Sequence, residues 1–277
     1  MIHKKNVLTI AGSDSSGGAG IQADIKTFEA LNIYGASVIT AITAQNTLGV
    51  TAVHEVPNDN FASQLEAVLT DIHFDAIKIG MLKGVAHVNL LAEFVNRYEL
   101  GNIVLDPVMV STSGHILQDP EATEVMTKQL MPMARLLTPN IPEAAYLLNV
   151  DEAAIRNNPQ SASEQLLRRF SLNAVLLKGG HGKGNVVTDV LCHKAGTDNT
   201  QIEFRIYEYK KQDTLNIHGT GCTLSSAIAS FLAQGADLTS AVDAAGRYLQ
   251  VCLANASQQQ VGKGNGPVNH RAGGILQ

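Results

Sequence analysis

The sequence contains no tryptophan, and aromatic residues make up only 5% of its 277 positions. Proteins that bind nucleic acid rely on aromatic stacking platforms and on a basic face, whereas this chain has a formal net charge of −5. We therefore expect no nucleic-acid partner. An anionic substrate would have to be bound by local hydrogen-bond donors rather than by a general positive field.

Long hydrophobic runs are also missing. The first apolar run, Val7–Ile10, gives way at once to polar residues and glycines, so it is too short for a signal peptide, and no segment approaches the length needed to cross a bilayer. The three cysteines, Cys192, Cys222 and Cys252, are widely spaced and match no CxxC pattern. Such spacing is typical of free thiols in a reducing compartment. We expect a cytoplasmic protein without a membrane partner.

Short β-branched runs alternate with amphipathic helical patterns along the chain. The predicted strands are Val7–Ile10, Ala36–Thr43, Ala76–Ile79, Ile103–Leu105, Leu136–Thr138 and Ala174–Leu177. The predicted helices lie around Ile21–Leu31, Phe61–Ile72, Val88–Tyr98, Cys222–Gln234 and Leu238–Ala254, the first of them ended by Gly35. This alternation predicts an α/β fold, with a mainly parallel central sheet covered by helices on both faces.

The segment Val186–Tyr209 departs from this alternation. It holds two β-rich runs, VVTDVLCH and QIEFRIYEY, joined by the turn-like Gly196–Asn199. This pattern predicts a small antiparallel hairpin at the edge of the sheet. Because no linker, internal repeat or low-complexity stretch interrupts the chain, we expect residues 1–277 to form one domain.

Candidate site residues follow the predicted strands, because ligands of open α/β sheets bind beyond the carboxyl ends of the strands. The glycine-rich segment Gly12–Gly20 lets the backbone approach a ligand closely and precedes the free N–H groups of a helix start. It matches neither a Walker A loop nor a Rossmann fingerprint, so a tight βα turn is an alternative. For Asp24, one helical turn later, the alternative is a solvated surface carboxylate.

Polar residues also follow the other strands. The amide of Gln45 suits the donor and acceptor edge of a ring, with a polar turn as the alternative. Asp106, at a strand end, can hold Mg²⁺ through water. Asn140 and Glu143 open a proline-flanked helix, where a glutamate also favours the helix dipole. Lys178 precedes two glycines and is suited to binding phosphate.

The sharpest motif is HGTGCTL, which begins at His218 and runs into an apolar helix. The N–H groups of Gly219, Thr220 and Gly221 at a helix N-terminus form an anion hole. Cys222 lies in the first turn, where the helix field is expected to lower the pKa of a thiol. The thiolate could then accept the proton of a substrate hydroxyl. A helix start with a small buried cysteine is the structural alternative.

Seven motifs occur in the order AGSDSSGGAGIQAD, AQNT, KIGML, LDPVM, TPNIPEA, LKGGH and HGTGCTLSSAIA. Together they resemble the hydroxymethylpyrimidine/phosphomethylpyrimidine kinases of thiamine biosynthesis, which belong to the ribokinase-like superfamily. The resemblance extends from about Val7 to His270. It implies a three-layer domain, commonly homodimeric. That domain would use ATP and Mg²⁺ to phosphorylate 4-amino-5-hydroxymethyl-2-methylpyrimidine and then its monophosphate.

The resemblance also implies a role for each motif. The residues expected to hold the pyrimidine are Gly12, Asp24, Gln45, Met81 and Val108. The residues expected to hold ATP and Mg²⁺ are Asp106, Asn140, Glu143 and Lys178. The residues expected to form the anion hole and the catalytic base are Gly219, Thr220, Gly221 and Cys222. Cys222 falls where most ribokinase-like enzymes carry an aspartate and where the pyrimidine kinases carry cysteine.

The chain departs from the family at one place and leaves three other functions open. Lys263 replaces a histidine in the family's C-terminal GHGxGPV pattern, which could alter phosphate handling. A pyridoxal kinase is the nearest alternative, although an amide at Gln45 matches an aminopyrimidine edge. A non-catalytic pyrimidine-binding protein is another alternative, because fold alone does not prove activity. A third alternative makes Cys222 a covalent nucleophile, for which no partner histidine and carboxylate are evident.

Overall fold

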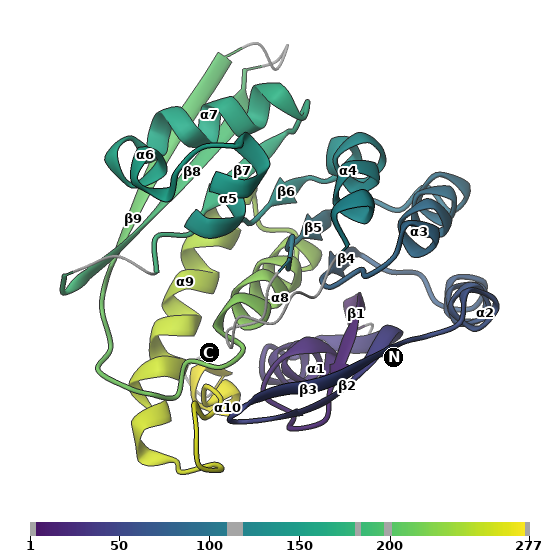
Figure 1. Ribbon diagram of the computed structural model, residues 1–277, viewed down its shortest axis with the longest axis horizontal. Coiled ribbons are helices and arrows are strands. Elements are labelled where there is room, and N and C mark those ends of the chain that lie inside the picture. The colour runs from purple at the N-terminus through teal and green to yellow at the C-terminus, as the bar shows by residue number, and fades with distance from the viewer. Residues whose placement is uncertain (1–3, 110–118, 181–183, 197–200, 275–277) are drawn as a thin grey trace.

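A nine-stranded sheet runs through the computed structural model, which describes residues 4–109, 119–180, 184–196 and 201–274 (Figure 1). Its strands are β1 Asn6–Asp14, β2 Tyr34–Asn46, β3 Gly49–Glu55, β4 Ala76–Ile79, β5 Ile103–Leu105, β6 Leu136–Leu137, β7 Ala174–Leu177, β8 Val186–Ala195 and β9 Gln201–Lys210. They lie in the order β3-β2-β1-β4-β5-β6-β7-β8-β9. Six neighbouring strands are parallel to one another, namely β2, β1, β4, β5, β6 and β7. At one edge β3 is antiparallel to β2, and at the other β8 is antiparallel to both β7 and β9.

Helices cover both faces of the sheet, which confirms the predicted three-layer α/β fold. The helices are α1 Gly20–Ala30, α2 Asn58–Leu69, α3 Val85–Arg97, α4 Pro120–Gln129, α5 Ile141–Leu148, α6 Glu152–Asn157, α7 Pro159–Arg169, α8 Thr220–Ala233, α9 Leu238–Ala254 and α10 His270–Gly274, with 3₁₀ turns at Met131–Met133 and Ala256–Gln258. Figure 1 shows α1, α8, α9 and α10 gathered on one face and α2 to α7 on the other. Each face has its own apolar core, one containing Phe28 and Leu224 and the other Phe61 and Leu166.

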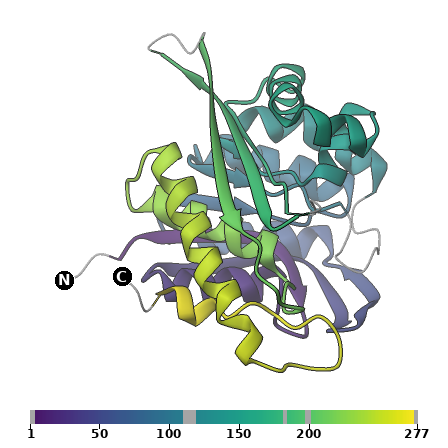
Figure 2. The same cartoon turned by 90° about the vertical axis from the view of Figure 1, so that its left-hand side faces the viewer.

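The antiparallel hairpin predicted over Val186–Tyr209 is confirmed as β8 and β9. Figure 2 shows it reaching beyond the helices at one end of the molecule. The turn predicted at Gly196–Asn199 lies mostly outside the described residues, and so does His181 of the LKGGH motif. In the described part of the chain, no helix is long and apolar enough to span a membrane.

The predicted end of the first helix is wrong. Helix α1 ends at Ala30, and Asn32 adopts a left-handed conformation with φ of 58°. Ile33 donates its N–H to the carbonyl of Phe28 and closes the helix end. Asparagine tolerates this conformation and here takes the place expected for a C-terminal glycine. Gly35 lies instead in β2, where it packs against Phe28.

The first two strands are longer than predicted. Strand β1 continues through Gly12 to Asp14, and β2 continues through Gln45 to Asn46. The turns named as alternatives for these segments are present but begin only after the strands, at Ser15 and Thr47. The two strands pair almost along their whole length, with a register shift between Ala11 and Ser13. Strand β3, which was not predicted, returns antiparallel to β2. Pairing with neighbours holds these polar residues in strands in spite of weak local β propensity.

Candidate active site

The carboxyl ends of the parallel strands meet the start of helix α8. Asp106 follows β5 and Lys178 follows β7, and Lys178 Nζ lies 2.8 Å from Asp106 Oδ1. Thr138, after β6, donates its hydroxyl to the same oxygen at 3.0 Å. A Cβ atom on Gly221 would lie 3.5 Å from Lys178 Nζ and 3.6 Å from Asp106 Oδ2. The sheet edge and the glycine motif therefore form one site.

The site contains two ionised side chains, Asp106 and Lys178, that are largely shielded from water. Burial opposes ionisation of Asp106, but Lys178 and Lys78 hold the pKa of its carboxyl below the usual range. Burial also disfavours the charge of Lys178, yet Asp106 and Glu143 raise the pKa of its ammonium group. Both groups are therefore ionised at neutral pH, and each compensates the other's lost hydration.

Asn140 and Glu143 begin helix α5 with a reciprocal capping box. Asn140 Oδ1 accepts the N–H of Glu143 at 2.9 Å, and Glu143 Oε2 accepts the N–H of Asn140 at 2.8 Å. Burial raises the pKa of Glu143 to about 7; Lys178 opposes that rise and the charge of Asp106 adds to it. Glu143 lies in the first turn of the helix, as predicted, and its carboxyl group also lies in the electrostatic field of the site.

Asp106 and Glu143 fit a magnesium ion. No group of three or more His, Cys, Asp or Glu side chains suited to a metal occurs among the residues the model describes. Mg²⁺ usually takes only one or two protein carboxylates, together with water and substrate phosphates. The charge of Asp106 contributes to the raised pKa of the buried Glu143 carboxyl, so the two groups lie within electrostatic reach of each other.

Gly219 shapes the start of helix α8. It is the N-cap residue, with φ of 81°, and a Cβ atom there would lie 1.9 Å from the carbonyl oxygen of Gly18. Only glycine combines this conformation with such close approach. Of the three predicted anion-hole amides, that of Thr220 donates to the carbonyl of Ile217 at 3.3 Å. The N-terminus of this 14-residue helix is thus aimed at Lys178 and Asp106.

The expected lowering of the Cys222 pKa is wrong. Burial raises the pKa of this thiol to about 11; the charge of Lys78 opposes the rise, while Asp24 and Asp106 add to it. The helix field, which prompted the expectation, does not offset the loss of hydration and the two carboxylates. The thiol is therefore protonated at neutral pH in the ligand-free protein. Cys222 is a free thiol, as are Cys192 and Cys252.

Asp24 is fully buried, so its interpretation as a solvated surface carboxylate is wrong. Its Oδ2 accepts hydrogen bonds from Lys78 Nζ at 2.8 Å and from the hydroxyl of Thr9 at 2.6 Å. Its Oδ1 accepts the hydroxyl of Ser226, one turn beyond Cys222, at 2.7 Å. Both oxygens are thus engaged by protein groups, and the carboxylate links α1, β1, β4 and α8.

The residues predicted to hold the ring lie around the end of β1. A Cβ atom on Gly12 would lie 3.1 Å from Met81 Cε. Met81 belongs to a small apolar cluster with Ala41, against which Val108 packs. Gln45 is half-buried near the end of β2. Gly12, Met81 and Val108 are therefore brought together, with Gln45 on the adjacent strand.

Three buried polar residues of this region, Lys78, Asp14 and His218, were not predicted from the sequence as site residues. Lys78 has no exposed surface, and its position inside the apolar strand AIKI was a signal of a buried ion pair. Asp14 accepts the N–H groups of Ser16, Gly18 and Ala19 and a hydrogen bond from His218 at 2.8 Å. No local pattern in the sequence indicated the pair formed by Asp14 and His218.

The C-terminal segment passes close to the end of β2. Thr47 Oγ1 accepts the N–H groups of Lys263 and Gly264, each at 3.1 Å. The backbone N–H of His218 donates to the carbonyl of Gly266. Lys263, the residue that departs from the family pattern, is exposed on this segment.

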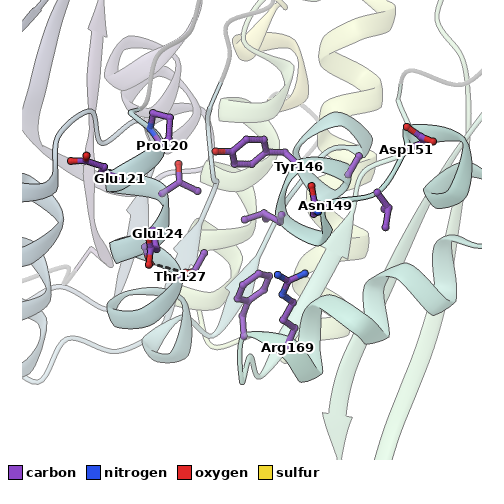
Figure 3. Close-up of a pocket in the computed structure, with 13 residues that line it drawn as sticks. Pro120, Glu121, Glu124, Thr127, Tyr146, Asn149, Asp151 and Arg169 are labelled. Atoms are coloured by element: carbon purple, nitrogen blue, oxygen red, sulfur yellow. Dashed lines mark hydrogen bonds between the residues drawn. The ribbon is translucent and has the colours of Figure 1, made fainter.

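A shallow groove of about 790 Å³ lies elsewhere, between α4 and the region of α5 and α6 (Figure 3). Tyr146 and Arg169 are among its lining residues. None of the predicted site residues, all of which the model describes, lines it. Arg169 donates one of its guanidinium N–H groups to the carbonyl of Leu148 at 3.0 Å.

Comparisons with known proteins agree with this geometry. The family model described as phosphomethylpyrimidine kinase matches residues 14–269. A hydroxymethylpyrimidine/phosphomethylpyrimidine kinase of Rhizobium meliloti (strain 1021) is 44% identical over 267 residues, which cover 95% of this chain and 96% of that protein. Among solved structures, a phosphomethylpyrimidine kinase from Clostridium difficile 630 is 42% identical with a TM-score of 0.74, covering 89% of this chain and 98% of that one. An ADP complex of Bacillus subtilis pyridoxal kinase is 33% identical with a TM-score of 0.86, covering 98% of both chains.

Proposed function

The chain belongs to the phosphomethylpyrimidine kinase family, and we propose that it uses ATP to phosphorylate 4-amino-5-hydroxymethyl-2-methylpyrimidine and then the monophosphate. The observation that carries this proposal is the Lys178–Asp106 pair beside Gly221 at the start of helix α8. A cation, a carboxylate and a helix N-terminus in one buried site suit phosphoryl transfer, which depends on positioning and charge stabilisation.

In the proposed site, one set of residues binds the pyrimidine and a second set, on the other side, binds the phosphates of ATP. Gly12, Met81 and Val108 contact the pyrimidine ring, and Gln45 hydrogen-bonds its polar edge. Because both oxygens of Asp24 are engaged by protein groups, we assign that residue a supporting role under the ring and under α8.

Lys178 and the amides of the glycine motif bind the phosphates on the other side. Asp106 and Glu143 would hold Mg²⁺, which when bound neutralises phosphate charge. Asn140 supports this arrangement by fixing Glu143 through the capping box. Hydrogen bonds already fix these side chains to one another, so they require little reorganisation as charge develops on the transferred phosphoryl group.

The first reaction requires removal of a proton. The substrate's hydroxymethyl oxygen forms a bond to the γ-phosphorus as the bond from that phosphorus to the β,γ-bridging oxygen breaks. The thiolate form of Cys222, a minor fraction at neutral pH, accepts the hydroxyl proton. In the second reaction the attacking phosphate oxygen is already anionic and needs no base. Cys222 thus acts as a base in the first step rather than as a covalent nucleophile.

The direct test is ATP consumption by the purified protein with hydroxymethylpyrimidine, its monophosphate and pyridoxal offered separately. We expect turnover of both pyrimidines, with a higher kcat/KM for hydroxymethylpyrimidine than for pyridoxal. Replacing Lys178 with Met is expected to lower turnover of every substrate about a hundredfold, because one preorganised cation is lost. The same replacement at Lys128, exposed on α4, is the matched control.

Each alternative has its own outcome in this experiment. A preference for pyridoxal would mean that this chain's substrate is that of the pyridoxal kinases, one of which shares this fold at 33% identity. ATP turnover independent of added pyrimidine, or no turnover at all, would revive the non-catalytic binding protein. The three free cysteines support a reducing compartment, and hence a cytoplasmic location, as part of the proposal.

A homodimer is the proposed assembly. Strand β3 is an edge strand, and the β2–β3 hairpin exposes Ile42 and Leu48 by 53% and 67%. Exposed apolar edges favour pairing with another chain. Sedimentation velocity is expected to give twice the chain mass, and lysine at both positions is expected to give monomers. Lysine at Val150 and Leu215, which are exposed by 43% and 79% and lie on neither edge strand, should leave the dimer intact, and a monomeric wild type would contradict the proposal.

A further inference from the structure

His218 Nε2 is shared between two side chains that come from different parts of the chain. It lies 2.8 Å from Asp14 Oδ2 and 3.2 Å from the amide nitrogen of Gln45. The other end of the Gln45 amide, its oxygen, lies 3.1 Å from Thr43 Oγ1. His218 and Asp14 are themselves buried. Two things must be determined from these contacts: whether His218 Nε2 carries a hydrogen, and which end of the Gln45 amide is the NH₂ group.

The contact with Asp14 decides the proton on His218. His218 and Ser16 outweigh the effect of burial and hold the pKa of Asp14 well below its usual range, so its carboxylate accepts hydrogen bonds and cannot donate them. An unprotonated Nε2 at 2.8 Å would place two lone pairs against each other. His218 Nε2 therefore carries a hydrogen. It cannot at the same time accept an N–H of Gln45.

The contact with Thr43 leads independently to the same conclusion. The hydroxyl of Thr43 has a single hydrogen, and the carbonyl of Ser13 accepts it at 2.9 Å. Thr43 Oγ1 can then only accept from Gln45. The end of the Gln45 amide that faces Thr43 must be the NH₂ group, and the end that faces His218 must be the oxygen.

We propose that the Gln45 amide is turned so that its oxygen faces His218 and its nitrogen faces Thr43, and that His218 is a positioning residue which fixes this order. Turning the amide by 180° exchanges only its two ends. The NH₂ group then donates to Thr43, and the oxygen, instead of the NH₂ group, lies against the N–H that His218 directs at Asp14. The inference deepens the proposed function, on which its consequence for substrate choice rests.

A fixed amide presents one acceptor and one donor to a ring in a set order. A ring whose edge offers a donor and an acceptor in the complementary order makes two hydrogen bonds, as an amino group beside a ring nitrogen does. A ring that lacks this pair leaves a polar group of the site unsatisfied, which is the strongest basis for discrimination between similar substrates. Without the N–H of His218 the amide can turn, and the discrimination falls.

Two variants of His218 separate positioning from packing. His218→Leu keeps bulk but loses the N–H, and His218→Gln keeps an N–H donor near the same place. We expect His218→Leu to lower the ratio of kcat/KM for hydroxymethylpyrimidine to that for pyridoxal by about tenfold, and His218→Gln to lower it by less than about threefold. His54→Leu, at an exposed position of β3, should leave the ratio unchanged.

The ratio cancels any loss of rate that affects both substrates, as a distortion of the neighbouring anion hole would. An unchanged ratio in His218→Leu, with equal loss for both substrates, would overturn the inference and leave His218 a packing role. Absence of turnover by the wild type would instead overturn the proposed function. Neutron diffraction from crystals of the deuterated wild type tests the inference without activity. Two deuterium atoms on the end of the Gln45 amide that faces Thr43 support it, and two on the end that faces His218 overturn it.

Discussion

Cys222→Ala is expected to lower kcat for hydroxymethylpyrimidine by about 10² to 10⁴ and to leave turnover of the monophosphate within about threefold of the wild type. The alcohol must lose a proton as it attacks, whereas the monophosphate attacks through an oxygen that is already ionised. Steady-state ATP consumption with each substrate at saturation measures the difference. Cys252→Ala, which removes a buried thiol on the core-facing side of α9, is the matched control.

The pH dependence has a definite sign. The thiolate is the active form, and burial raises the pKa of Cys222 to about 11. From pH 8 to 10, above the pKa of about 7 of Glu143, the fraction of thiolate grows up to tenfold per unit. Over this range kcat/KM for the alcohol should rise with pH in the wild type and stay flat in Cys222→Ala. Cys222→Asp supplies a carboxylate that is ionised throughout this range and should also give a flat profile. Equal losses with both substrates in Cys222→Ala would show that the thiol supports the anion hole rather than accepting a proton.

Lys78→Met is expected to lower the free energy of unfolding by about 3–5 kcal/mol. Lys78 and Asp24 lie 2.8 Å apart with no side-chain exposure. Burial disfavours the charge of the lysine, but Asp24, together with Asp106 and Cys222, raises its pKa above the usual range. The variant leaves Asp24 as an uncompensated buried charge, which is the costly half of a broken ion pair. Urea unfolding followed by circular dichroism measures the loss.

Two further variants test the cause. Lys5→Met breaks a pair of similar length, 2.7 Å to Asp75, but Lys5 is 51% exposed and the expected loss is at most about 1 kcal/mol. The double variant Lys78→Met with Asp24→Asn removes both charges while the amide retains hydrogen bonds to Thr9 and Ser226. It should recover most of the stability lost in Lys78→Met. A double variant no more stable than the single one would attribute the loss to packing of the lysine stem.

Several elements follow from local sequence alone. The strands Ala76–Ile79, Ile103–Leu105 and Ala174–Leu177 and the helix Leu238–Ala254 lie where the sequence predicts them. Each apolar run is bounded by polar residues or glycine, and its periodicity is read within a few neighbours. The chemistry of the motifs is equally local, because a glycine-rich helix start and a lysine at a strand end need no distant partner to be recognised.

The extent of β1 and β2, the burial of Asp24 and the pKa of Cys222 depend on contacts that no local window contains. Asp24 meets Lys78 from 54 positions away and Ser226 from 202, and Asp14 meets His218 from 204. The sequence by itself determined the order of elements and the family's set of functional groups. Only the tertiary structure decided which groups are buried and which partner each one meets. Hydration and Coulomb interactions, which fix ionisation and orientation, depend on distance in space rather than along the chain.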